Sequence, residues 1–355
     1  RIGILTGGGD CPGLNAVIRA AAKTLINVYG ADVYGLKDGF SGLVFNRIKK
    51  LSYDDVSNIL TEGGTILGTD NKSNLFGVKR NESQRVAVGK NHTSQAIRNF
   101  KKYKLDGLIC IGGDGTLTVA HTLHQKGIHV VGVPKTIDND VMHTDQTFGF
   151  DTAVTTATEA IDKLHSTAAS HKRVMIVEVM GRSAGWIALQ SGMAGGGDVI
   201  LIPELPFKLD AIYKVVRKRF RKGRHFSIIV VAEGAHLVGE EPIYKTKAHG
   251  LSGIAQRLAT SIEKDTGIDS RATILGHLQR GGTPTPFDRV LATRYGHHAA
   301  HLAAKGLFGQ MVCLRNNGIE TISLKEVAGI PRRIPVDSLL IQAAKDVGTS
   351  FGIDN

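Results

Sequence analysis

The chain has 355 residues, 42% of them hydrophobic, so it can bury a large core, and its length favours two domains over one. A formal net charge of +12 favours anionic partners such as phosphorylated metabolites, nucleotides or nucleic acid. Three scattered cysteines, Cys11, Cys110 and Cys313, argue against a disulfide framework or a zinc site. No apolar run reaches the roughly 18 residues of a membrane span, and no signal peptide is visible. These features predict a globular cytoplasmic protein that does not enter a membrane.

The chain opens with a strand–turn–helix pattern. A buried-strand pattern over residues 2–5 leads into a glycine-rich turn at 6–10, and a helical stretch follows from Pro12 to about Val28. The same order recurs where a strand pattern at 107–111 precedes the loop 112–116, and the next helix leads to a strand at 130–133. This alternation predicts a mostly parallel sheet.

A second set of elements begins near Asp151. A helical pattern reaches Ser166, and strand patterns follow at residues 173–179, 198–202 and 227–232. We therefore predict an α/β fold with two Rossmann-like three-layer domains that meet near Phe150.

Three segments interrupt this alternation. Residues 76–92 and 234–249 are polar and lack periodicity, so we expect surface insertions or lids. The basic run 217–225 could be a nucleic-acid patch. It follows a helical pattern, however, and cations are favoured in the last turn of a helix, so a solvated helix end is the better interpretation.

Glycine- and aspartate-rich loops follow three predicted strands, where open parallel sheets bind ligands. The glycines at 7–9 let backbone amides approach phosphate oxygens, although a tight turn alone would also use glycine. Loop 112–116 adds Asp114, a carboxylate that could hold magnesium. Loop 134–140 combines two carboxylates, an amide, a hydroxyl and an ammonium, a composition typical of a site for charged groups.

Two common nucleotide-binding motifs are not found. No GxxxxGK[ST] occurs, and the first loop does not read GxGxxG, so any nucleotide binds in another way. Phosphoryl transfer needs a base for the acceptor hydroxyl, magnesium across the donor phosphates and cations on the migrating group. The three loops contain residues for all of these roles.

Taken together, the segments resemble the phosphofructokinases. The match runs in order through residues 3–15, 112–116, 134–140, 179–182 and 275–282. The resemblance implies transfer of the terminal phosphoryl of ATP to the 1-hydroxyl of fructose 6-phosphate, which gives fructose 1,6-bisphosphate in glycolysis. It also implies a donor domain of residues 1–149 plus about 279–330, and a sugar-phosphate domain of 150–278 plus about 331–355.

The resemblance further implies roles for single residues. Asp138 is the expected general base, Thr136 and Arg182 are expected to contact the transferring phosphoryl, and Asp114 and Asp140 are the expected Mg²⁺ ligands. The positions expected to line the donor are Gly9, Lys72, Gly113, Asp114, Gly115 and Thr116. The positions expected to bind the sugar phosphate are Thr136, Asp138, Arg173, Met180, Gly181, Arg182, Glu233, Arg271, His277 and Arg280.

Arg173 and Arg271 match family arginines that reach across from a neighbouring subunit. The resemblance therefore implies a homotetramer, or at least a homodimer, with a shared sugar-phosphate site.

Two positions bear on the phosphoryl donor, and they point in different directions. Gly115 resembles ATP users, because a small residue leaves room for the α-phosphate, whereas pyrophosphate users commonly carry Asp there. Lys135 is typical of pyrophosphate users but also of some ATP-dependent members. A filled space forbids ATP, whereas an extra lysine can stabilise either donor, so we favour ATP.

Several alternatives stay open from the sequence. Pyrophosphate is the alternative donor, and sedoheptulose 7-phosphate is an alternative acceptor. NAD kinases and lipid kinases also use a Gly-Gly-Asp-Gly loop, but they lack the segments at 134–140 and 180–182. A sugar-phosphate or nucleotide sensor would be expected to lose the base, yet Asp138 and Asp114 are both present. No nucleic-acid recognition motif occurs, so we expect no nucleic-acid partner.

Overall fold

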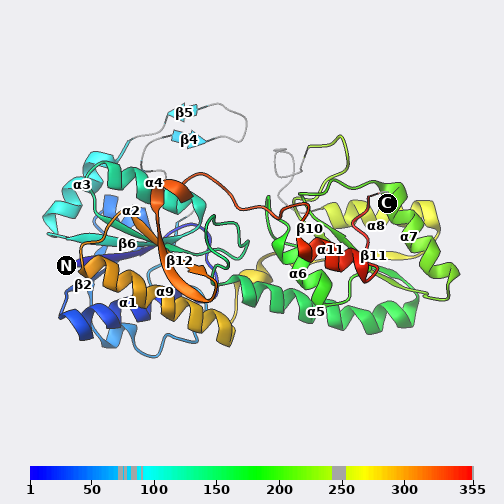
Figure 1. Ribbon diagram of the computed structural model, residues 1–355, viewed down its shortest axis with the longest axis horizontal. Helices are drawn as coiled ribbons and strands as arrows, with labels where there is room; N and C mark the ends of the chain where they lie inside the picture. Colours follow the sequence, from blue (N-terminus) through cyan, green and yellow to red (C-terminus); the bar gives the residue numbers. More distant parts are fainter. Residues whose placement is uncertain (71–74, 76–77, 81–85, 89–90, 242–252, 354–355) are drawn as a thin grey trace. The chain divides into compact units, whose positions relative to one another are not determined.

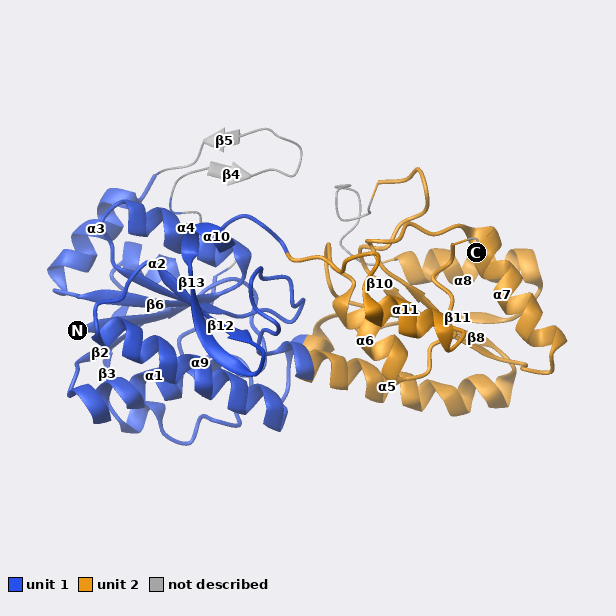
Figure 2. Ribbon diagram, in the orientation of Figure 1, with its two compact units in different colours: residues 1–151, 280–331 blue, residues 152–279, 332–355 orange. Residues whose placement is uncertain are grey.

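The structure is a computed structural model that describes residues 1–353 except 71–74, 76–77, 81–85, 89–90 and 242–252. The chain divides into two compact units (Figure 2). Unit 1 contains residues 1–151 and 280–331, and unit 2 contains residues 152–279 and 332–355. Each unit is built from a sheet with helices packed on it (Figure 1).

Unit 1 contains a seven-stranded sheet in the order β13-β12-β7-β6-β1-β2-β3. Its strands are β1 (Ile2–Thr6), β2 (Val33–Leu36), β3 (Ile48–Leu51), β6 (Gly107–Gly112), β7 (Val130–Pro134), β12 (Gln310–Arg315) and β13 (Gly318–Ser323). Neighbouring strands are parallel except at the two edges, where β3 pairs antiparallel with β2 and β13 pairs antiparallel with β12. The predicted mostly parallel sheet is therefore confirmed.

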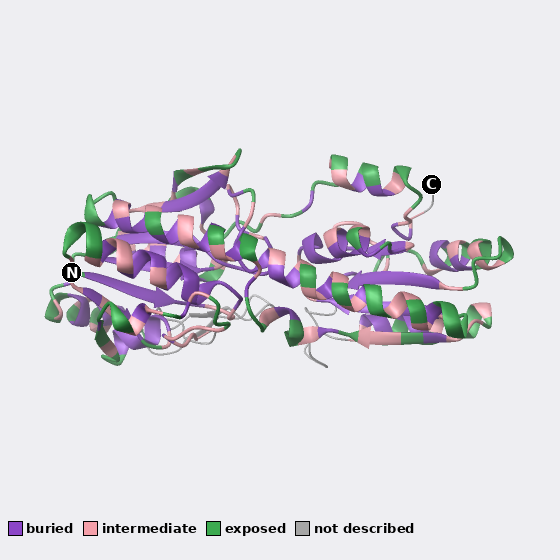
Figure 3. Cartoon of the chain, turned by 90° about the horizontal axis from the view of Figure 1, so that it is seen from below, coloured by how far each residue is buried: buried purple, intermediate pink, exposed green. Residues whose placement is uncertain are grey.

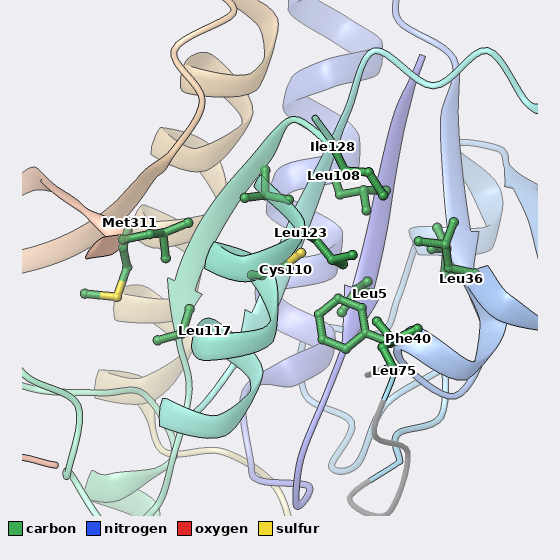
Figure 4. Close-up of a cluster of buried hydrophobic side chains, with 14 of the residues drawn as sticks. Leu5, Leu36, Phe40, Leu75, Leu108, Cys110, Leu117, Leu123, Ile128 and Met311 are labelled. Atoms are coloured by element: carbon green, nitrogen blue, oxygen red, sulfur yellow. The ribbon is translucent and has the colours of Figure 1, made fainter. Parts of the chain in front are cut away.

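Helices cover both faces of this sheet (Figure 1). One face carries α1 (Leu14–Tyr29) and α9 (Pro286–Ala304). The other face carries α2 (Phe40–Val44), α3 (Thr93–Lys102), α4 (Asp114–Gln125) and α10 (Leu324–Val327). Because side chains alternate along a strand, β6 directs Leu108 and Cys110 into the core beneath α4, where they meet Leu5, Leu117 and Leu123 (Figure 4).

The two helices on the first face pack at very close range. A Cβ atom placed on Gly296 of α9 would lie 2.5 Å from the carbonyl oxygen of Val17 and 2.9 Å from the Cβ of Ala20. Only glycine leaves room for this approach, because the opposing atoms include α1 backbone. The contact fixes α9 against α1 along the sheet (Figure 1).

Unit 2 is organised around a fully parallel four-stranded sheet in the order β11-β8-β10-β9. Its strands are β8 (Val174–Val179), β9 (Val199–Leu201), β10 (Ser227–Ala232) and β11 (Ser270–Ile274). The helices are α5 (Phe150–His171), α6 (Trp186–Ala194), α7 (Leu209–Arg221), α8 (Ile254–Thr266) and α11 (Leu339–Asp346). The central strands of both sheets are buried, whereas the sides of the helices that face away from the sheets are exposed (Figure 3).

Three segments were expected to interrupt the alternation of strands and helices, namely 76–92, 217–225 and 234–249. The basic run is confirmed as a helix end: α7 stops at Arg221, and Arg219 pairs with Asp198 at 2.7 Å. The segment 76–92, which shows no strand periodicity in the sequence, contains the short antiparallel strands β4 (Val78–Arg80) and β5 (Val86–Val88). Half of the segment 234–249, residues 242–249, lies outside the described residues. Within the described part of the chain, no helix has the length and apolarity to cross a bilayer.

Candidate active site

Two glycine loops meet at the carboxyl ends of β1 and β6 in unit 1. The amide of Gly7 donates to the carbonyl of Ile111 at 2.9 Å. A Cβ atom on Gly7 would lie 2.7 Å from Oγ1 of Thr116, and one on Gly112 would lie 2.3 Å from the Thr116 Cβ. Glycine is therefore required on both loops for them to close around the buried Thr116 side chain.

The second loop runs directly into the N-terminus of α4. Gly113 is the N-cap residue of α4 and supplies no side-chain cap, so the first amides of the helix remain available to anionic groups. Asp114 opens the helix, and its Oδ1 accepts a hydrogen bond from the Gly329 amide at 2.8 Å. Gly115 is exposed, and a Cβ atom there would meet nothing within 4 Å. The space above Gly115 is open.

Lys135, the first residue after β7, ties the loops together. Its side chain is buried, its Nζ donates to the carbonyl of Gly9, and its backbone amide donates to the carbonyl of Gly112 at 3.0 Å. Desolvation by burial lowers the pKa of Lys135. The lysine therefore has a structural role in holding the first glycine loop against the loop that follows β7.

The turn 136–140 holds Asp138 in a fixed position. The Asp138 amide donates to Oγ1 of Thr136 at 3.0 Å, and Asn139 adopts a left-handed conformation with φ of 52°. Oδ1 of Asn139 accepts from the Thr147 amide at 3.0 Å, and the Thr147 hydroxyl donates to the carbonyl of Thr136 at 2.7 Å. All four residues are buried. Their hydrogen bonds define the backbone that presents the Asp138 carboxyl group.

Asn139 and Thr147 were not among the residues that the sequence singled out for a role. Asn139 stands between two expected site residues, and asparagine tolerates left-handed backbone better than most residues, so a signal for it existed. Thr147 carries no sequence signal, because its role comes from the fold, which pairs Lys135 with Phe148 in a parallel bridge.

Carboxylates crowd the end of this turn. Desolvation by burial, followed by the charge of Asp138 and more weakly that of Asp114, raises the pKa of Asp140 to about 6. Among the residues that the structure describes, no group of three or more His, Cys, Asp or Glu side chains could enclose a metal ion. Magnesium is commonly bound by one or two carboxylates together with substrate phosphates. The carboxylates of Asp114 and Asp140 fit that mode of binding.

Unit 2 contains a second polar cluster, at the carboxyl ends of β8 and β10. The Arg182 amide donates to Oε1 of the buried Glu233 at 2.9 Å. Arg182 has φ of 51° and Gly181 has φ of 143°, so both lie in backbone regions that most side chains disfavour. A Cβ atom on Gly234 would lie 1.9 Å from the Arg182 carbonyl oxygen. The loop 180–182 is therefore held tightly against the residues that follow β10.

A buried amide ties this loop to the segment after β11. Oε1 of Gln279 accepts from the Met180 amide at 3.2 Å, and its Nε2 donates to the carbonyl of Gly276 at 3.0 Å. Gln279 is fully buried, whereas its neighbour His277 is exposed. The structure thus brings Met180, Arg182, Glu233 and the segment of His277 together, and Gln279 is a positioning residue that the sequence did not single out.

Arg173 and Arg271 lie at the amino ends of the strands of the same sheet, opposite the cluster around Arg182. Arg173 precedes β8 and Arg271 lies near the start of β11, whereas Met180 follows β8. At about 3.3 Å per residue, Arg173 lies about 23 Å from Met180 along β8, and Arg271, which pairs with Met175, lies about 16 Å from the level of Met180. Both arginines pair with Asp269. They therefore do not join the cluster around Arg182 within one chain.

Two expected residues remain, Arg280 and Lys72. Arg280 was grouped with the sugar-phosphate residues, but it belongs to unit 1, where its Nη1 donates to the carbonyl of Asp10 at 3.0 Å beside the first glycine loop. It turns back to this loop because the chain re-enters unit 1 at Arg280. Lys72 lies outside the described residues.

Comparison with known proteins decides the family. The family model for phosphofructokinase matches residues 1–303. The chain belongs to the phosphofructokinase family. Its relatives include "ATP-dependent 6-phosphofructokinase 2" of Clostridium perfringens, 49% identical over 99% of this chain and 98% of that protein. "ATP-dependent 6-phosphofructokinase 3" of Bacteroides thetaiotaomicron is 47% identical over 99% of this chain and all of that protein.

Solved phosphofructokinases share the fold. A Saccharomyces cerevisiae phosphofructokinase superposes with a TM-score of 0.78 at 33% identity, covering 92% of this chain and 45% of the yeast chain. A pyrophosphate-dependent phosphofructokinase from Marinobacter aquaeolei superposes with a TM-score of 0.82, covering 99% of this chain and 88% of that one. The latter is 23% identical, so it supports the phosphofructokinase fold alone. The expected family and fold are confirmed.

Proposed function

We propose that this phosphofructokinase transfers the terminal phosphoryl group of ATP to the 1-hydroxyl of fructose 6-phosphate. The relatives that match nearly the whole chain carry the name ATP-dependent 6-phosphofructokinase. The observation that carries the proposal is the buried turn 136–140, which presents Asp138 next to two glycine loops suited to phosphate. In this proposal unit 1 binds the donor and unit 2 binds the sugar phosphate.

Asp138 acts as the general base. O1 of the sugar forms a bond to the terminal phosphorus of ATP, and the proton of the 1-hydroxyl passes to the Asp138 carboxylate. The bond between that phosphorus and the leaving oxygen of ADP breaks at the same time. Since the turn is fixed by Asn139 and Thr147, the backbone that carries Asp138 is held in place before the transfer. Thr136 and Arg182 donate to the oxygens of the migrating group, where negative charge is concentrated.

Asp114 and Asp140 would hold magnesium. The bound ion would neutralise charge on the donor phosphates. A cation beside Asp140 would also offset the repulsion from Asp138 that raises the pKa of Asp140 in the protein alone. The amides at the start of α4 would bind the phosphate oxygens, with Gly9, Gly113 and Thr116 lining the same loops.

The donor is assigned to ATP on the basis of Gly115 and Lys135. The open space above Gly115 admits a nucleotide α-phosphate. Lys135, which suggested pyrophosphate, has a structural explanation that is independent of the donor, because its Nζ donates to the carbonyl of Gly9. A lysine that holds two loops together is compatible with ATP as well as with pyrophosphate as the donor.

The acceptor is bound by the cluster in unit 2 and by a second subunit. Arg182, Glu233 and His277 bind the sugar phosphate from the chain's own unit 2, and Met180 and Gly181 shape the loop. Arg173 and Arg271 lie at the amino ends of β8 and β11, away from the cluster, and in this proposal they serve a neighbouring copy. The enzyme is therefore an oligomer, at least a dimer, and a single chain is inactive.

Subunit complementation tests the shared site. We expect Asp138→Asn and the double variant Arg173→Ala, Arg271→Ala each to be inactive alone. If the two variants are unfolded and refolded together, mixed dimers contain one site with both intact halves, which restores about a quarter of the wild-type activity. An inactive mixture that has formed mixed oligomers, seen by native mass spectrometry, would contradict the shared site.

Steady-state kinetics test the proposed reaction. The untagged protein is assayed with fructose 6-phosphate and Mg²⁺, with ATP or pyrophosphate as the sole donor. Asp138→Asn is expected to lower kcat by about 10²–10⁴-fold, whereas Asp54→Asn, a change to an exposed carboxylate of unit 1, leaves kcat unchanged. Activity with pyrophosphate alone would overturn the donor assignment, and full activity of Asp138→Asn would overturn the base.

A further inference from the structure

Three histidines on the C-terminal half of α9, His297, His298 and His301, take no part in the proposed reaction. His297 and His301 are four residues apart, so they lie on the same face of the helix. Their Nε2 atoms are 2.9 Å apart. His297 is exposed, and His301 is partly exposed. Two imidazoles whose ring nitrogens converge at the surface form a pair of ligands for a metal ion.

The separation of the two nitrogens, which is that of a hydrogen-bonded pair, is compatible with a coordination angle near 90°. Two nitrogens 2.9 Å apart that each lie about 2.1 Å from a common metal ion subtend an angle of about 90° at that ion. A tetrahedral ion at the same bond length would need nitrogens about 3.4 Å apart. Angles near 90° occur in square-planar, tetragonal and octahedral complexes, and imidazole ligands in tetragonal geometry are typical of Cu²⁺ and Ni²⁺.

Tyr29 supports the same assignment from the neighbouring helix. Its hydroxyl lies 2.5 Å from Nδ1 of His301. A histidine that binds a metal through Nε2 usually donates its Nδ1 proton to an oxygen acceptor, which fixes the tautomer and the ring orientation. Tyr29 is the last residue of α1, and the close packing of α1 on α9 at Gly296 brings it within reach.

We propose that His297 and His301, oriented by Tyr29, form a surface site for a divalent first-row transition metal ion of the Cu²⁺ or Ni²⁺ type. The ion occupies the position of the proton that the two Nε2 atoms share, and that proton moves to Nδ1 of His297. Water completes the coordination, since the described residues offer no third His, Cys, Asp or Glu ligand. Mg²⁺ does not compete, because it prefers oxygen ligands.

Calorimetric titration of the untagged, Mg²⁺-replete protein with Ni²⁺ tests the site. Ni²⁺ avoids redox reactions with thiols, and the three cysteines are in any case buried. We expect the wild-type protein to bind one Ni²⁺ ion per chain. The affinity for this ion should fall by at least about tenfold, or binding should be lost, in His297→Gln and in His301→Gln, and the affinity should fall by about tenfold in Tyr29→Phe. His121→Gln, a change on α4, is the matched control and leaves the affinity unchanged.

Electron paramagnetic resonance of the Cu²⁺-loaded protein provides an independent measurement. Two equivalent nitrogen couplings that become one in His297→Gln would support the proposal. Wild-type Ni²⁺ binding that persists unchanged in His297→Gln would overturn it. Equal loss of binding in His298→Gln would also overturn it, because the pair would then be His298 and His301, three residues apart.

Discussion

Gly115→Asp is the substitution that separates the two phosphoryl donors. A Cβ atom at this position meets nothing within 4 Å, so the folded protein accommodates the side chain without strain. The new carboxylate also lies in the first turn of α4, where a negative charge stabilises a helix by about 0.3–1 kcal/mol. We therefore expect the melting temperature to stay the same or to rise slightly.

The catalytic effect has the opposite sign. A carboxylate about 4 Å from an α-phosphate charge is repelled by about 1 kcal/mol in bulk water and about 4 kcal/mol in a partly shielded site. These energies correspond to a loss of about five-fold to about 10³-fold in kcat/KM for ATP. Because Gly115 is exposed but sits at the mouth of the glycine loops, we expect a loss of about 10–10²-fold, with no loss of any activity with pyrophosphate.

Gly115→Asn is the matched control, since it has the same size without the charge. Comparing the two variants by kcat/KM for ATP divides the effect into steric and electrostatic parts. A correctly folded Gly115→Asp protein that keeps its kcat/KM for ATP within about threefold of wild type would refute the reasoning that Gly115 admits the nucleotide.

Three further substitutions or reactions have defined outcomes. Gly296→Ala places a methyl group against α1 backbone, so we expect it to lower the free energy of unfolding by about 1–2 kcal/mol, the overpacking cost less the gain in helix propensity. Thermal melting measures this, with Gly115→Ala as a control that should not destabilise; a Gly296→Ala protein as stable as wild type would contradict the close contact. Thr147→Val removes the hydroxyl that donates to Thr136, and it should lower kcat by about tenfold with little change in KM, whereas Thr147→Ser restores kcat; equal losses in both would argue against the hydroxyl. Burial raises the pKa of the Cys11 thiol to about 12, and Cys110 and Cys313 are buried as well, so Ellman's reagent at pH 8 should detect no rapidly reacting thiol in the native protein and three in guanidinium; a fast-reacting native thiol would contradict their burial.

The sequence predicted those parts of the site whose residues lie within a single loop and whose role follows from the local sequence. The glycines before α1 and α4 and the charged loop after β7 stand at the carboxyl ends of parallel strands, where the fold class alone places ligands. Their identities follow from local chemistry, because glycine permits close approach and carboxylates bind cations.

Features that depend on contacts between distant segments could not be predicted in this way. Thr147 holds the turn of Asp138 only because the chain after β7 returns alongside it. Gln279 reaches Met180 from 99 residues away, and Arg280 turns toward Asp10 because the chain re-enters unit 1 at that point. Such roles follow from tertiary packing, which no local pattern of residues reports.

Phosphorus-31 NMR of the reaction mixture tests the central claim most directly. With fructose 6-phosphate, Mg²⁺ and ATP as the sole donor, we predict that the resonances of ADP and of a new 1-phosphate on the sugar grow together, and that Asp138→Asn slows the growth of both by about 10²–10⁴-fold. If the 1-phosphate resonance appears only when pyrophosphate replaces ATP, or if neither donor produces it with the wild-type protein, the proposed reaction is contradicted.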